Sequence, residues 1–152
     1  MIYISHRGNL SGKNTHTENT WNQIEKCLIL NYDVEIDIWF MNNMFYLGHD
    51  RPIEPIDIKK LMNSKLWCHA KNYDAIVEML KYKSIHCFWH ETDKYAITSN
   101  KILWSFPGEP IDSNTVCVLP ELTNFSMIYL QQSYAICSDN ITYYNRFLDT
   151  LL

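Results

Sequence analysis

Two carboxylates in one strand-like segment, Glu35 and Asp37, are the side chains of this sequence that point most directly to chemistry. They lie in the segment 33–39, which alternates polar and apolar residues with period two. Residues two apart on a strand face the same side, so the two carboxylates share one face of the strand. Such a pair repels unless a cation or protons compensate it, and oxygen ligands suit Mg²⁺ or Ca²⁺. We expect a divalent-metal site here, with a solvated face of an edge strand as the alternative.

Histidines and cations follow other strand-like segments. His6 lies beside Arg7, and His49 lies beside Asp50. Histidine titrates near pH ~6.5, so two imidazoles that flank a substrate can serve as base and acid near neutral pH. Arg7 offers a bidentate fork for a phosphate and Lys71 a point charge. A structural histidine and ordinary surface cations are the simpler interpretations of these residues.

A second histidine-rich group lies further along the chain. Trp67, His69 and Lys71 share one strand face, and His86, Phe88 and His90 share another, with Asp93 just beyond. A second metal site from His90 and Asp93 is conceivable, but a hydrogen-bonded structural role is the favoured interpretation. Aromatic residues such as Trp89 and Trp104 are expected in the core or in a pocket wall.

The elements that must position these residues alternate between strand and helix patterns. We expect strands at 2–5, 33–39, 44–47, 66–70, 85–89, 95–97, 102–106, 116–119 and 134–137, with a hairpin turn at Asn42-Asn43. Helices are expected from Trp21, from Pro55, after Asn72, and at the C-terminus through Leu151. This alternation predicts an α/β fold with a mainly parallel sheet, either doubly wound or a barrel. Polar residues that follow the strands then meet at the carboxyl edge of the sheet.

Composition narrows the class of protein. The 152 residues include 13 basic and 17 acidic side chains, a formal charge of −4, and the cations are scattered. This argues against extended nucleic-acid binding, which relies on clustered Lys and Arg. The apolar runs are too short for a transmembrane segment, and no signal peptide precedes the first strand. Five cysteines without metal-site spacing predict buried, reduced thiols. We therefore expect one cytoplasmic domain over residues 1–152.

The order of the motifs resembles the glycerophosphodiester phosphodiesterase family of the phospholipase C-like phosphodiesterase superfamily. The matching motifs come in the same order and at closely similar spacing: His6-Arg7-Gly8, Glu18-Asn19-Thr20, Glu35-Ile36-Asp37 and His49-Asp50. The segment Cys137-Ser138-Asp139-Asn140 also looks like the last-strand signature of that family. The resemblance thus extends from the first strand to the C-terminal region.

The resemblance implies a fold, an activity, a metal and roles for individual residues. The expected fold is a (β/α) TIM-type barrel, reduced in size, and the expected activity is metal-dependent hydrolysis of a small-molecule phosphodiester, a reaction of lipid metabolism. The implied roles are metal ligation by Glu35 and Asp37, acid/base catalysis by His6 and His49, phosphate binding by Arg7, and support by Glu18, Asn19 and Asp50. The metal implied is Mg²⁺ or Ca²⁺, and it neutralises the phosphoryl oxygens together with the arginine.

Two departures from the family pattern change these expectations. The third strand of the family usually carries Glu-x-Lys, whereas this chain has His69-Ala70-Lys71. A histidine ligand favours Mn²⁺ or Zn²⁺ over Mg²⁺ or Ca²⁺, and Glu121 is a candidate for the missing charge. The chain is also about 100 residues shorter than a usual barrel of ~250 residues, and the substrate-binding insertion after His49 is absent.

Three further functions remain open from the sequence. A phospholipase D-like lyase that releases a cyclic phosphate would use the same residues. A non-catalytic module that binds a phosphate ligand on the same fold is motivated by His69. A plain structural protein would bind no metal. An oligomer is also conceivable, with Tyr143-Tyr144 and Leu151-Leu152 as a contact patch.

Overall fold

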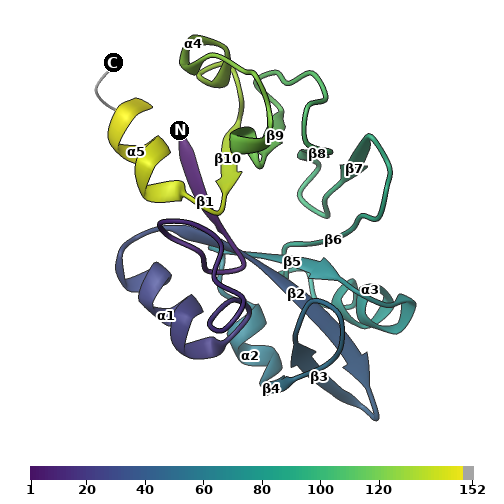
Figure 1. Cartoon of the computed structure of the whole chain (residues 1–152). Helices are drawn as coiled ribbons and strands as arrows, with labels where there is room; N and C mark the ends of the chain where they lie inside the picture. The colour runs from purple at the N-terminus through teal and green to yellow at the C-terminus, as the bar shows by residue number, and fades with distance from the viewer. Residues whose placement is uncertain (149–152) are drawn as a thin grey trace.

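Ten strands within residues 1–148, the part of the chain that the computed structural model describes, form one curled sheet (Figure 1). The strands are β1 (Ile2–His6), β2 (Asp33–Met41), β3 (Met44–Leu47), β4 (Glu54–Ile56), β5 (Leu66–Ala70), β6 (Cys87–Trp89), β7 (Tyr95–Ile97), β8 (Leu103–Ser105), β9 (Thr115–Val118) and β10 (Ala135–Ser138). The helices are α1 (Trp21–Ile29), α2 (Ile58–Leu61), α3 (Tyr73–Met79), α4 (Met127–Leu130) and α5 (Ile141–Leu148), with a 3₁₀ turn η1 (Pro120–Leu122). The fold is therefore mixed α/β, as the sequence predicts.

Seven of the strands run parallel to one another. Their order is β6-β5-β2-β1-β10-β9-β8, and each neighbouring pair is parallel. The first half of β2 lies between β1 and β5, while its second half pairs antiparallel with β3. In this register His6 is the partner of Glu35, and Asp37 is the partner of His69. The sheet thus brings residues from three strands side by side at its carboxyl edge.

The two ends of the parallel order face each other but do not pair. Within residues 1–148, β6 forms a ladder only with β5, and β7 pairs antiparallel with β8. A backbone hydrogen bond from Ser99 N–H to the Cys87 carbonyl, 2.8 Å long, links the β7 end to β6. The described strands form a curled sheet and not a closed barrel.

The concave face of the sheet has its own apolar core. This cluster contains Ile4, Trp67, Phe88, Trp104, Val116, Val118, Ala135 and Cys137. The rings of Phe88 on β6 and Trp104 on β8 are 4.5 Å apart, although their strands stand at opposite ends of the parallel order. The curl of the sheet is therefore filled by large side chains, each of which stabilises the fold by roughly 1.5–3 kcal/mol on burial.

The convex face carries the helices. One apolar cluster lies beneath α1, α2 and α3 and includes Val34, Ile36 and Ile38 of β2. A second lies beneath α4 and α5 and includes Ile136 and Tyr144. Since the apolar residues of β2 point to the convex face, the alternating Glu35 and Asp37 point to the concave one. Both are buried on a central strand, so the alternative of a solvated edge strand is wrong.

Local sequence signals explain most of the elements. Thr20 caps α1 by accepting the Gln23 N–H, and Asn72 caps α3 by accepting the Ala75 N–H. Asn42 and Asn43 both have positive φ, +52° and +60°, as the tight turn between β2 and β3 requires. All five cysteines are buried and free, as predicted.

Two expectations about elements are wrong or lie outside the described residues, and further short elements were not expected. Pro55 does not open a helix: it lies in β4, an edge strand that tolerates the missing N–H, and α2 begins after its cap Asp57. The short elements η1 and α4 were not predicted. Helix α5 is present, but Leu151 and Leu152 lie outside the described residues.

Candidate metal centre

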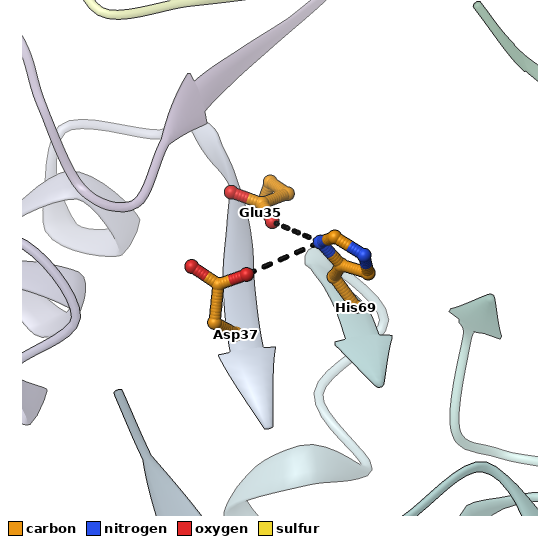
Figure 2. Close-up of side chains that lie close together, drawn as sticks. All are labelled: Glu35, Asp37 and His69. Carbon is orange, nitrogen blue, oxygen red and sulfur yellow. Dashed lines mark ion pairs between the residues drawn. The ribbon is translucent and has the colours of Figure 1, made fainter. Parts of the chain in front are cut away.

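Glu35, Asp37 and His69 form one buried cluster at the carboxyl edge of β2 and β5 (Figure 2). One ligand atom from each residue lies within 4.8 Å of the others. His69 Nδ1 is 3.1 Å from Asp37 Oδ1 and 3.5 Å from Glu35 Oε1. Such a group of two carboxylate oxygens and one imidazole nitrogen can hold a divalent metal ion.

The opposite nitrogen of the His69 ring sets its tautomer. Nε2 lies 2.7 Å from the backbone carbonyl of His90, which can only accept, so Nε2 carries the proton. The ring also stacks on Phe88 at 5.0 Å with an interplanar angle of 7°. In the neutral ring, Nδ1 then presents its lone pair to the two carboxylates. Metal-ligating histidines are held in the same way, through the second ring nitrogen.

Asp37 is surrounded by donors and cations. Its Oδ2 accepts 2.8 Å from Asn19 Nδ2 and lies 3.1 Å from Arg7 Nε, while Lys71 Nζ is 3.6 Å from Oδ1. Asn19 also accepts the Asp37 N–H at 2.9 Å, from a backbone with φ of +55° that asparagine tolerates better than most residues. Apart from His69 Nδ1 at 3.1 Å, buried Asp37 Oδ1 has no hydrogen-bond partner.

This arrangement keeps the cluster charged. Burial would raise the pKa of Asp37, but the His69 hydrogen bond and the charges of His69 and Arg7 hold it well below its usual range. Burial would lower the pKa of His69, but hydrogen bonds to Asp37 and Glu35 raise it to about 9. Without a metal, His69 is therefore an imidazolium that bridges two carboxylates near neutral pH.

The residues fit a metal ion. A neutral His69 would turn its Nδ1 lone pair toward two carboxylate oxygens, which is repulsive unless a proton or a metal cation lies between them. Asp37 Oδ1, which has no hydrogen-bond partner other than the His69 ring, faces the same point. Glu121, the candidate for an additional ligand, is not part of the cluster. The cluster therefore offers three protein ligands and leaves the remaining positions open.

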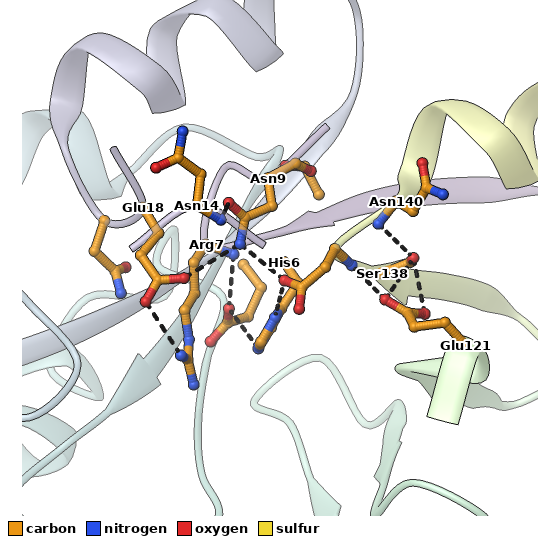
Figure 3. Close-up of polar contacts among 12 residues, drawn as sticks. His6, Arg7, Asn9, Asn14, Glu18, Glu121, Ser138 and Asn140 are labelled. Atoms are coloured by element: carbon orange, nitrogen blue, oxygen red, sulfur yellow. Dashed lines mark hydrogen bonds and ion pairs between the residues drawn. The ribbon is translucent and has the colours of Figure 1, made fainter. Parts of the chain in front are cut away.

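A second network, on β1 and β10, holds His6 (Figure 3). His6 Nδ1 is 2.7 Å from Asp139 Oδ1, and its Nε2 is 3.8 Å from Glu35 Oε2, so the free ring nitrogen faces the metal cluster. Buried Asn9 donates to the same Asp139 oxygen at 2.8 Å. Burial would lower the pKa of His6, but Asp139 and Glu35 raise it. A carboxylate–imidazole pair of this kind suits proton transfer at Nε2.

Glu121 belongs to this second network. It accepts the Ser138 hydroxyl at 2.9 Å and the Asp139 N–H at 2.8 Å, as Figure 3 shows for its bonds with Ser138. Ser138 Oγ in turn accepts the Asn140 N–H at 2.8 Å. Glu121 therefore fixes the end of β10, from which Asp139 reaches His6.

Arg7 and Glu18 close the site on the side of the loop that follows β1. Arg7 has a φ of +54°, its N–H donates to Glu35 Oε2 at 3.2 Å, and its NH1 lies 3.6 Å from Glu18 Oε1. Burial would lower the pKa of Arg7, but Asp37, Glu35 and Glu18 raise it. Both expected phosphate ligands, Arg7 and Lys71, thus lie beside the metal cluster.

His49 and Asp50 do not join the cluster. Gly48 N–H donates to the Asp37 carbonyl at 3.2 Å, which puts this loop beside β2. The His49 side chain is 37% exposed, and within residues 1–148 its ring bonds only Asp50, at 2.6 Å between Nδ1 and Oδ1. Asp50 itself is 91% exposed. The expected pair of histidines is therefore represented at the cluster by His6 alone.

Two of the remaining candidates have other surroundings. Trp104 is buried in the apolar core of the concave face. His90 gives its backbone carbonyl to His69, and its own Nδ1 is buried without a partner. Burial and the charge of His69 lower the pKa of His90. Within the described residues, no group of three or more His, Cys, Asp or Glu side chains that could hold a metal ion includes His90 or Asp93.

Sequence reasoning missed Asn9 and the roles of Ser138 and Asp139. The strand-end position of Ser138-Asp139 was a usable signal, because it reaches the same edge of the sheet as His6. Asn9 offered no such signal, since it lies in an irregular loop.

The comparisons with known proteins give no relative: no family model, no curated protein and no solved structure matches this chain. Among the helices of residues 1–148, none has the length and apolar character that a membrane crossing requires.

Proposed function

We propose that this protein is a metal-dependent phosphodiester hydrolase on a reduced (β/α) barrel. The observation that carries the proposal is the position of His69 Nδ1, 3.1 Å from Asp37 Oδ1 and 3.5 Å from Glu35 Oε1, with the second ring nitrogen of His6 beside Glu35. A metal ion held there would neutralise the phosphoryl oxygens of a bound diester. Arg7 and Lys71 lie within reach of the same point and add positive charge.

The order of the parallel strands supports the barrel. From β1 through β2, β5 and β6, and then from β8 through β9 to β10, the strands follow one another around the curl in chain order. That is the connectivity of a (β/α) barrel, whose active sites lie at the carboxyl edge. Between β6 and β8 the chain forms β7 and no helix.

His6 is the residue that we assign to proton transfer. Asp139 and Glu35 raise its pKa and so favour the protonated ring, and Asp139 at Nδ1 leaves Nε2 directed into the site. As the bond from phosphorus to the leaving oxygen breaks, this proton passes to that oxygen. The attacking hydroxyl forms the new bond to phosphorus and gives up its own proton to a base. The family resemblance assigns that base to His49, which lies outside the metal cluster on a loop held beside β2 by the Gly48 N–H.

The metal that the donor set favours is Mn²⁺ or Zn²⁺, because one ligand is an imidazole nitrogen. Chelated protein should regain activity on bis(4-nitrophenyl) phosphate when one of these ions returns, and less with Mg²⁺ or Ca²⁺. Thermal unfolding should shift upward with the same ion. Absence of both turnover and stabilisation with all four ions would contradict the proposal.

The control variant is His6→Ala, which leaves all three metal ligands in place. It should lose turnover but keep metal-induced stabilisation. ³¹P spectra of the products from a diester with a neighbouring hydroxyl decide between hydrolysis and release of a cyclic phosphate. Retained phosphate binding without turnover would favour a non-catalytic binding module.

A further inference from the structure

The metal cluster has a histidine on each side. In the strand order β6-β5-β2-β1, which can be followed in Figure 1, His90 follows β6 and His6 ends β1, so the strands that lead to them lie on opposite sides of β5 and β2. His90 lies on the concave face, because it alternates with the inward-facing Phe88. Its ring centre is 6.4 Å from that of His69.

The His90 backbone and side chain have separate partners. The backbone carbonyl accepts the His69 Nε2–H at 2.7 Å, which fixes the ring next to the cluster. The side chain is partly exposed, with its Nδ1 buried and unpartnered. The polar atom of the ring that remains open to solvent is therefore Nε2.

The burial of Nδ1 also decides which nitrogen carries the proton. A buried N–H without an acceptor costs more free energy than a buried acceptor without a donor at the same place, because the N–H loses a strong hydrogen bond to water. The neutral ring therefore places its proton on Nε2. This N–H is a donor that faces solvent, and the charged groups that act on the ring are His69, Asp93 and Lys71.

We propose that His90 Nε2–H donates a hydrogen bond to a phosphate oxygen of the bound diester, on the side of the cluster opposite His6. This inference rests on the proposed function, because it needs a phosphate at the cluster. It adds His90 to the residues that contact the substrate, in a role that is neither metal ligation nor support of the fold.

The test uses two amides that differ in reach. In His90→Gln the amide nitrogen can take the place of Nε2, whereas in His90→Asn it takes the place of Nδ1 and falls short. Both variants keep the backbone carbonyl that orients His69, so the metal cluster is unchanged. We expect His90→Asn to weaken binding of inorganic phosphate to the metal-loaded protein by roughly 10- to 100-fold, as for the loss of a hydrogen bond to a charged group. His90→Gln should stay within about threefold of the wild type.

Binding of inorganic phosphate is measured by calorimetry, with turnover of bis(4-nitrophenyl) phosphate as a second readout. Metal-induced thermal stabilisation of each variant shows that the cluster is intact, and His16→Asn, on an exposed histidine, is the matched control. Equal affinity of His90→Asn and wild type would overturn the role of His90 and leave the proposed function standing. Equal losses in His90→Asn and His90→Gln would also overturn it. A wild type that binds neither metal nor phosphate would overturn both proposals.

Discussion

The concave face of the sheet has two layers that each contain an aspartate and a histidine, and the pKa shifts of these residues have opposite signs in the two layers. At the carboxyl edge, Asp37 and His69 belong to the metal cluster. At the amino edge, Asp33 and His86 lie beside Trp67: the indole donates to Asp33 Oδ2 at 3.0 Å, and the His86 ring centre is 4.1 Å from that of Trp67. We call these the carboxyl-edge layer and the amino-edge layer.

The pKa shifts in the two layers have opposite signs. In the amino-edge layer, burial raises the pKa of Asp33 and lowers that of His86 to about 4, so both shifts favour the neutral forms. In the carboxyl-edge layer, the pKa of Asp37 falls and that of His69 rises to about 9, so both shifts favour the charged forms. Burial acts in the same direction in both layers.

The two layers differ in how many hydrogen-bond and ion-pair partners surround their titratable side chains. Asp37 has Asn19, Arg7, Lys71 and His69 around it, while His86 Nε2 has no hydrogen-bond partner. An apolar core does not need charged groups, and keeping them charged there requires donors from several separate segments. The carboxyl-edge layer therefore has the charged, hydrogen-bonded groups of a binding site, and the amino-edge layer has the neutral groups of an apolar core.

The largest expected effect is the loss of Asp37. Asp37→Asn removes a metal ligand and leaves Arg7, Lys71 and protonated His69 without their shared counter-charge. Metal affinity should fall by more than about 100-fold, the upper loss for an outer-shell residue. The metal-free protein should lose about 3–5 kcal/mol of unfolding free energy, as when one partner of a buried ion pair is removed.

Calorimetric metal titration and chemical denaturation measure these two quantities. The matched variant is Asp33→Asn on the same strand, which should leave metal affinity unchanged and cost only about 1 kcal/mol. If both variants changed metal affinity equally, the distinction between the layers would fail.

The second effect is the pH dependence of metal binding. A metal ion must displace the proton that His69 holds up to a pKa of about 9. Metal affinity should therefore rise by about tenfold per pH unit, or roughly 100-fold from pH 6 to pH 8. Competition titrations with a chelator of known pH dependence measure it. In His69→Gln, whose amide has no titratable proton, this slope should disappear, and a slope that persists would assign the proton to another group.

A smaller effect is expected from the second network. Asp139→Asn keeps the shape of the side chain but removes the charge that orients His6, so proton transfer should weaken. Turnover should fall by roughly 10- to 100-fold, as for other groups that position a reacting residue. The alkaline limb of the pH–rate profile should also move to lower pH, because His6 must be protonated to act and Asp139 helps to raise its pKa. A purely structural role would lower turnover without moving that limb.

Much of the carboxyl-edge layer could be predicted from the sequence. The period-two pattern placed Glu35 and Asp37 on one face, and parallel pairing predicted that His6 and His69 would join them at one edge. These inferences depend on local spacing and on the rule that active sites follow strands. The order of the strands and the register that aligns Asp37 with His69 confirm this part.

The rest depended on contacts that spacing does not encode. The conformation of the loop that turns His49 toward Asp50 is set by Gly48, with φ of +146°, and by its backbone bond to β2. Glu121 bonds the end of β10 rather than the metal cluster, because η1 follows β9 directly. The contrast between Asp33 and Asp37 was equally hidden, since both occupy the same face of β2 and differ only in what the loops bring to them.

The smallest effect, on stability alone, tests the amino-edge layer through His86. Its pKa in the folded protein, about 4, lies below the ordinary value of 6.5. The unfolded chain therefore binds a proton first as the pH falls, so this group's contribution is complete above pH 6.5 and is lost between about 6.5 and 4. His69 behaves oppositely, since its contribution is complete below pH 6.5 and is lost as the pH rises toward 9.

His86→Leu should therefore be less sensitive to acid than the wild type. At pH 7 the two metal-free proteins should differ by less than about 1.5 kcal/mol, because the substitution roughly conserves volume beside Trp67. Between pH 7 and pH 5 the thermal midpoint of the wild type should drop further than that of the variant, since only the wild type must protonate a buried imidazole on unfolding. The difference between the two decreases in thermal midpoint gives the effect of His86 alone, because the effect of the carboxylates is the same in both proteins. Equal drops would mean that His86 keeps its ordinary pKa, and burial without partners would then not be what separates the two layers.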